Sequence, residues 1–144
     1  MASVEDLDQV IERYQRALNE LLKGNPEPNK TMFSHREDVT ILNPIGSLAY
    51  GWEQVSATME DVASQVSDGE ITSFETLEKY VTPELAYVVW VERSKARVGE
   101  KQDIEPFDLR VTLILRPEDG TWKVVHRHAD SLTTGQPIEV VLKE

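Results

Sequence analysis

The 144-residue sequence contains no cysteine, which excludes disulfides, thiolate nucleophiles and zinc sites built from cysteine. Basic residues are scarce: 15 Lys and Arg stand against 26 Asp and Glu, and the formal net charge is −11. Because nucleic acids and anionic membranes attract clustered Lys and Arg, this balance argues against both as partners. No apolar run approaches the ~20 residues that span a bilayer, and residues 1–8 are acidic and polar, unlike a secretory signal. We therefore expect a cytoplasmic protein.

Several catalytic signatures are also missing. The sequence has no glycine-rich phosphate loop, no Gly-x-Ser-x-Gly element, no His-Glu-x-x-His pair and no EF-hand loop, which argues against nucleotide hydrolysis and serine-type acyl transfer. The composition is globular, with 40% hydrophobic and 28% charged residues, and the length is typical of one domain. We expect a single domain over residues 1–134 and a C-terminal tail over residues 135–144, whose apolar residues either pack on a partner or stay loose.

Two long segments carry apolar residues at helical spacing. The spacing predicts an amphipathic helix over residues 3–24 and a second helix over residues 52–69, each closed by a glycine. Between them, residues 25–28 are typical of a turn and residues 29–34 of a short helix.

The rest of the domain is typical of β-strands. Strands are expected over residues 37–42, 47–50, 70–81, 85–98, 107–115 and 121–130. A bulge is expected within 70–81, and residues 116–120 are typical of a hairpin loop. Helices followed by a run of long strands indicate an α+β domain, in which helices cover one face of a mainly antiparallel sheet. A curved sheet closed by helices tends to enclose an apolar cavity, which is the usual place for a ligand.

The last predicted strand carries an unusual set of polar residues. Alternation places Trp122, Val124, His126, His128 and Asp130 on one face. If this face lines a cavity, either imidazole can exchange a proton near neutral pH, and Asp130 can fix a histidine tautomer or act as a base. The alternative is structural: neighbours satisfy both histidines, and Asp130 merely ends the strand.

A His-x-His pair beside a carboxylate is also one arrangement that binds metal ions. His35 or Glu92 could complete such a set with His126, His128 and Asp130. Because nothing local supplies an unambiguous third ligand, we expect no metal and no other cofactor.

Residues on other predicted elements could share the same site. Glu92 is a candidate general base if it is buried, and Arg110 is either a solvated residue or the anchor of an anionic ligand. Trp90 is either a core residue or a ligand platform. Tyr14 and Trp52 lie on the apolar faces of their helices, where packing is the simpler explanation, although the Tyr14 hydroxyl could reach a cavity.

The closing hairpin carries a resemblance to a known family. Residues 109–130, with Asp-Gly-x-Trp-x-Val-Val-His-x-His near their end, resemble the final hairpin of SnoaL-like proteins in the nuclear transport factor two-like (ketosteroid isomerase-like) superfamily. Residues 38–46, 51–52 and 81–88 support the resemblance. It implies a cone-shaped α+β fold, in which a strongly curved, mainly antiparallel sheet wraps around N-terminal helices. It also implies a pocket at the wide end and frequent dimerisation through the outer face of the sheet.

The same resemblance leaves two functions open, because one fold of this kind serves many activities. In the first, the domain binds a small, largely apolar organic molecule and performs proton transfer, as an isomerase, cyclase or dehydratase does. His126 and His128 match the paired histidines of the family's last strand, and Asp130 stands where many relatives have Ser. We expect His128 and Asp130 to act as acid and base. The ligand-binding residues are then expected to be Tyr14, Trp52, Trp90, Glu92, Arg110 and His126. In the second, the domain is a noncatalytic ligand sensor or a dimeric partner-binding module. In both, we expect a homodimer.

Overall fold

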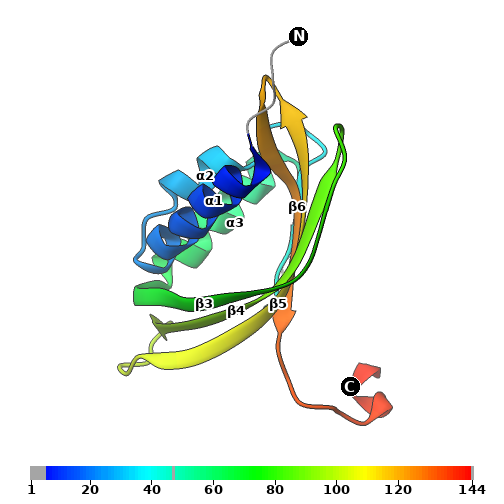
Figure 1. Cartoon of the computed structure of the whole chain (residues 1–144). Helices are drawn as coiled ribbons and strands as arrows, with labels where there is room; N and C mark the ends of the chain where they lie inside the picture. The colour runs from blue at the N-terminus through cyan, green and yellow to red at the C-terminus, as the bar shows by residue number, and fades with distance from the viewer. Residues whose placement is uncertain (1–5, 47, 144) are drawn as a thin grey trace.

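The computed structural model describes residues 6–46 and 48–143. Three helices precede the long strands of one sheet (Figure 1). The elements are α1 (Leu7–Leu22), α2 (Glu27–Met32), β1 (Thr40–Leu42), β2 (Leu48–Tyr50), α3 (Trp52–Ser64), β3 (Val66–Val81), β4 (Ala86–Val98), β5 (Glu105–Glu118), β6 (Thr121–Ser131) and the 3₁₀ helix η1 (Ile138–Val141). No helix in these two described ranges is long and apolar enough to cross a membrane.

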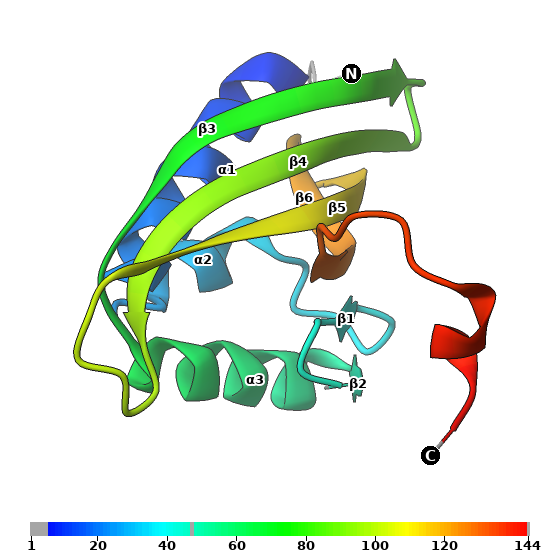
Figure 2. The same ribbon diagram turned by 90° about the horizontal axis from the view of Figure 1, so that it is seen from below.

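The six strands form a single sheet in the order β2-β1-β6-β5-β4-β3. All neighbours are antiparallel except β1 and β6, which run parallel. The long strands bend strongly, and the helices lie inside the curve (Figures 1 and 2). The expected α+β fold with a curved, mainly antiparallel sheet around N-terminal helices is therefore confirmed.

Helix α1 lies against the sheet because one of its sides is apolar. The Asp6 side chain caps the helix by accepting a hydrogen bond from the Asp8 N–H, at 3.0 Å. The predicted start at residue 3 lies outside the described residues. The helix ends before Gly24, whose φ of +96° suits glycine. Its buried side consists of Leu7, Val10, Tyr14, Ala17, Leu18, Leu21 and Leu22.

Several predicted boundaries were wrong, among them the starts of β1 and β3, which lie at Thr40 and Val66 rather than at residues 37 and 70. Helix α3 ends at Ser64 rather than near residue 69, because β3 already pairs with β4 from Val66 onward. Gly69 does not end the helix but lets β3 pass close to the end of α1, since a Cβ there would lie 2.7 Å from Leu22 atoms. Helix α2 begins at Glu27 and accepts Pro28 in its first turn, where a missing N–H costs nothing. Strand β5 runs on to Glu118, so the expected loop shortens to a turn around two residues of positive φ, Asp119 and Gly120.

A β-bulge in β6 decides which polar residues face the helices. Ile114 pairs with His126 and Leu115 with Val124, so Val125 is an extra residue on β6. Side chains on the two sides of the bulge therefore swap faces. The prediction that Trp122 and Val124 share a face with His126, His128 and Asp130 was wrong. Trp122 and Val124 lie in the core, whereas the two histidines and Asp130 lie on the outer face.

Candidate functional site

The bulge places an arginine inside the fold. The Arg127 guanidinium donates two hydrogen bonds to the Glu92 carboxylate, at 2.8 and 2.9 Å, and a third to the Tyr14 hydroxyl, at 3.1 Å. The Trp90 indole N–H also donates to Glu92, at 2.9 Å. The Arg127 side chain is 12% exposed and that of Glu92 is 3% exposed. We call Tyr14, Trp90, Glu92 and Arg127 the inner cluster.

The charges of the inner cluster are set by burial and by each other. Burial raises the pKa of the Tyr14 hydroxyl to about 12, despite the lowering effect of the Arg127 charge. Burial would lower the pKa of Arg127, but the charge of Glu92 and the Tyr14 hydroxyl outweigh it and raise that pKa. The cluster therefore holds one cation, one anion and a neutral phenol. Since Tyr14 accepts from Arg127, its own O–H proton is still available for donation.

Aromatic rings fill the space around the inner cluster. The Trp90 ring lies 6.1 Å from that of Tyr14 and meets the Phe74 ring edge-on at 5.3 Å, and Phe33 lies 6.2 Å from Tyr14. Trp90 and Tyr14 are each 1% exposed. Both residues, which we expected near a ligand, pack in the core. Glu92 is buried, as a candidate base would be, but Arg127 already binds it at both oxygens.

A second polar group lies on the outer face of the sheet. His128 Nε2 lies 3.0 Å from the Asp130 carboxylate, and Arg110 lies 4.0 Å from the same carboxylate. His126 Nδ1 shares a 2.7 Å hydrogen bond with the Thr40 hydroxyl. Four predicted site residues therefore gather here, and we call His126, His128, Asp130 and Arg110 the outer cluster. It borders a shallow hollow of about 190 Å³.

The two histidines of the outer cluster differ in their surroundings. Partial burial, helped by the nearby His128, lowers the pKa of His126 and so favours its uncharged form. His128 and Asp130 are each 46% exposed, and Arg110 is 62% exposed. In the two described ranges, no group of three or more His, Asp or Glu side chains is placed to hold a metal ion.

Trp52, another predicted ligand-binding residue, belongs to neither cluster. Its ring, at the start of α3, stacks on that of His35 with the centroids 3.7 Å apart. His35 is fixed in turn by a 2.9 Å hydrogen bond between its Nε2 and the Lys30 carbonyl.

A groove that sequence reasoning missed lies between the start of α1, the end of β3 and the start of β6. Its volume is about 550 Å³. Its lining is Asp6, Leu7, Asp8, Lys79, Val81, Thr82, Pro83 and Trp122. Lys79 and Asp8 form an ion pair across one side of the groove. The charged side chains therefore lie at the rim of the groove, and the larger apolar side chains form the rest of its lining. We call this the α1–β3 groove.

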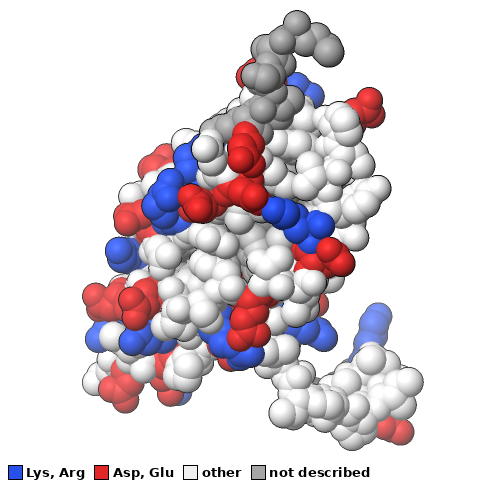
Figure 3. All heavy atoms as spheres, viewed as in Figure 1, with Lys and Arg blue, Asp and Glu red and all other residues white. Residues whose placement is uncertain are grey.

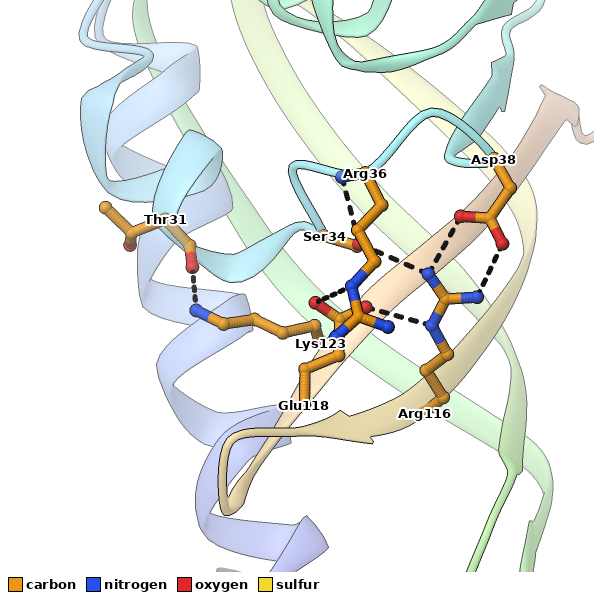
Figure 4. Close-up of polar contacts among 7 residues, drawn as sticks. All are labelled: Thr31, Ser34, Arg36, Asp38, Arg116, Glu118 and Lys123. Carbon is orange, nitrogen blue, oxygen red and sulfur yellow. Dashed lines mark hydrogen bonds and ion pairs between the residues drawn. The ribbon is translucent and has the colours of Figure 1, made fainter.

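A set of ion pairs holds the hairpin that carries Trp122 (Figure 4). Arg116 binds both oxygens of Asp38, at 2.7 and 2.8 Å, and one oxygen of Glu118, at 2.9 Å. Nη2 of Arg116, which already donates to Asp38, also donates to the Ser34 hydroxyl, at 3.4 Å. Lys123 donates to the Thr31 carbonyl, at 2.7 Å. We call this set of contacts the hairpin clasp, because it ties the β5–β6 hairpin to the chain between α2 and β1.

Comparisons with known proteins agree on the fold. A family model described as a SnoaL-like domain matches residues 9–133. No curated protein matches the chain. A nuclear transport factor 2 (NTF2-like) superfamily protein from Salmonella enterica serovar Typhimurium superposes with a TM-score of 0.75 at 15% identity, covering 92% of this chain and 93% of that one. A ketosteroid isomerase-like protein from Erwinia carotovora atroseptica gives 0.73 at 15% identity, with 88% and 94% covered. An uncharacterised protein with a cystatin-like fold from Caulobacter vibrioides gives 0.66 at 18% identity, with 88% and 87% covered.

Proposed function

This chain belongs to the SnoaL-like domain family, and we propose that it binds a small, largely apolar organic molecule in the α1–β3 groove. The observation that carries this proposal is the size and lining of the groove. A volume of about 550 Å³ falls in the range of small-molecule sites, which is roughly 300–1,000 Å³. Val81, which is 48% exposed, offers apolar surface beside the nearly buried Leu7 and Trp122, and the rim offers a few polar groups to orient a ligand. The filled interior around Trp90 supports a site at this groove rather than beside the inner cluster.

A fluorescence titration with the neutral probe N-phenyl-1-naphthylamine tests the groove. We expect one probe to bind per chain, and Val81→Glu to weaken binding at least about tenfold, because it places a charge against the apolar part of the ligand. Val81 is 48% exposed, so the change does not disturb the core. Leu77→Glu is the matched control, since Leu77 lies on the same strand, is 67% exposed and does not line the groove. Equal affinity in the wild type and Val81→Glu would contradict the proposal.

Proton transfer at the outer cluster is a second candidate function. It is favoured by the 3.0 Å contact between His128 and Asp130, which leaves Nδ1 of His128 as a proton donor or acceptor beside the hollow. Arg110 adds a positive charge that could stabilise a developing oxyanion.

A general probe of proton abstraction, the ring opening of 5-nitrobenzisoxazole, tests this second function. If the pair is catalytic, His128→Gln and Asp130→Asn are each expected to lower the rate by roughly 10²-fold, the usual scale of general acid–base assistance. His35→Gln is the control, because it removes an imidazole outside the outer cluster. Unchanged rates in His128→Gln and Asp130→Asn would remove proton transfer from this site.

We also propose that the chain forms a homodimer through the outer face of its sheet. Exposed apolar side chains on this face support the proposal, among them Tyr80 at 57%, Tyr50 at 65% and Leu48 at 74%. Exposed apolar patches of a soluble protein commonly mark contact surfaces. A twofold dimer is the commonest symmetric assembly, and it would have about twice the 16.4 kDa mass of one chain.

A further inference from the structure

The C-terminal tail exposes apolar side chains that no part of its own chain covers in the described structure. Every residue from 133 to 143 is exposed. Ile138 is 79% exposed, Val140 66%, Val141 75% and Leu142 68%. After Leu132, whose N–H donates to the Asp108 carbonyl at 2.8 Å, the tail runs clear of the sheet and the helices (Figures 1 and 2). Glu139 and Lys143 are its charged residues over 133–143, so most of its surface is uncharged (Figure 3).

The outer face of the sheet offers a matching surface. Strand pairing lines up two neighbouring rows, each across all six strands. The first row is Tyr80, Tyr87, Ile114, His126, Thr40 and Tyr50. The second is Glu78, Val89, Thr112, His128, Leu42 and Leu48. Glu78 is the one acidic residue among these twelve, in a chain with 26 acidic residues. We call these two rows the outer rows.

We propose that the tail of each chain packs on the outer rows of a second copy, so that the two chains exchange tails. This inference rests on the proposed homodimer and names the segment that holds it together. Because Val89, Thr112 and His128 line the hollow beside the outer cluster, a tail packed there covers the site of the second candidate function. The tail leaves the sheet at the end of β6, a strand that carries part of both rows, yet it points away from its own body. In a twofold pair, each tail meets the partner's rows, and each contact occurs twice. The tail carries two charged residues over 133–143 and the rows carry one acidic residue, so two chains of net charge −11 meet where few like charges oppose the contact.

Sedimentation equilibrium of the full chain tests the exchange. The double variant Ile138→Asp, Val141→Asp is expected to raise the dimer dissociation constant at least about tenfold, because it replaces two aliphatic contacts per tail by charges. Thr134→Asp, Gln136→Asp is the matched control: it adds the same charge to the same tail without removing an apolar side chain, and we expect at most about a twofold change.

Mixed dimers then show which chain each tail contacts. Because the sequence has no cysteine, a nitroxide on Val141→Cys labels the tail at one site. In a mixture with ¹⁵N-labelled wild-type chains, tail exchange predicts broadening of the Val89 and Thr112 amides of the ¹⁵N-labelled chain. A wild-type chain that stays monomeric overturns both the dimer and the exchange. A dimer that the Ile138→Asp, Val141→Asp variant leaves intact, or one without this broadening between chains, overturns the exchange alone.

Discussion

Replacing Glu92 by Gln is expected to lower the free energy of unfolding by about 3–5 kcal/mol, the usual effect of removing one partner of a buried ion pair. Gln keeps the shape of the side chain and an acceptor oxygen, but it removes the negative charge. The Arg127 cation, 12% exposed, is then left inside the fold with only the neutral Tyr14 hydroxyl as its other partner. Urea unfolding at pH 7, followed by circular dichroism, measures the loss.

An ion pair on the surface of the neighbouring strands provides the control. Glu75 on β3 binds Arg93 on β4 at 2.6 Å, but the two side chains are 49% and 39% exposed. Because water replaces the lost partner there, Glu75→Gln is expected to change the stability far less than Glu92→Gln. Equal losses in the two variants would show that burial does not govern the inner pair.

The double variant Glu92→Leu, Arg127→Met separates stability from function at the inner cluster. Buried ion pairs replaced together by apolar residues often leave stability unchanged or raised. We therefore expect the double variant to be far more stable than the sum of its single changes indicates. A double variant as stable as the wild type would mean that the charges and the Tyr14 hydroxyl are kept for binding or chemistry rather than for folding.

The closing strand marks where sequence reasoning succeeded and where it failed. Its position and its pairing with β5 followed from the alternation of apolar residues. The alternation did not predict which side chains of this strand face the core, because the bulge at Val125 moves every later side chain to the opposite face. Val125 is itself a good strand former, so it carries no local signal of a bulge. Arg127 was missed for a related reason: arginine is rarely buried, and its partners inside the fold, Glu92 and Tyr14, lie far from it in the sequence.

Sites assembled from distant segments were beyond the same reasoning. The α1–β3 groove joins residues near positions 7, 80 and 122, and no spacing along the chain indicates that they meet. The outer cluster was easier, because His126, His128 and Asp130 alternate on one strand and Arg110 pairs with Asp130 in register. Periodicity along the sequence therefore predicted which segments are helices and which are strands. It did not predict that α3 ends at Ser64, because that end is set by the pairing of β3 with β4.

Arg116→Ala is expected to lower the free energy of unfolding by about 2–3 kcal/mol, because the hairpin clasp loses its central cation and Glu118 loses its closest partner. Glu118 is only 9% exposed, and the remaining cation, Arg36, lies 3.7 Å away on the surface. Arg116→Lys keeps the charge without the two-pronged contact to Asp38, so an intermediate loss is expected.

The clasp should also make stability depend on pH. The hydrogen bonds from Arg116 hold the pKa of the Asp38 carboxyl below its ordinary value of 3.8. A carboxyl with a lowered pKa in the folded state stabilises the protein above its ordinary pKa, and this stabilisation is lost as the pH falls through the lowered value. The difference in unfolding free energy between the wild type and Arg116→Ala should therefore be constant from about pH 8 to 5 and shrink below about pH 4. Because Asp38 is 58% exposed, solvent screens its contribution to stability. Asp38→Asn should therefore lower the free energy of unfolding less than Arg116→Ala does. A difference between the wild type and Arg116→Ala that persists unchanged to pH 2.5 would mean that packing of the arginine, rather than its charge, holds the hairpin.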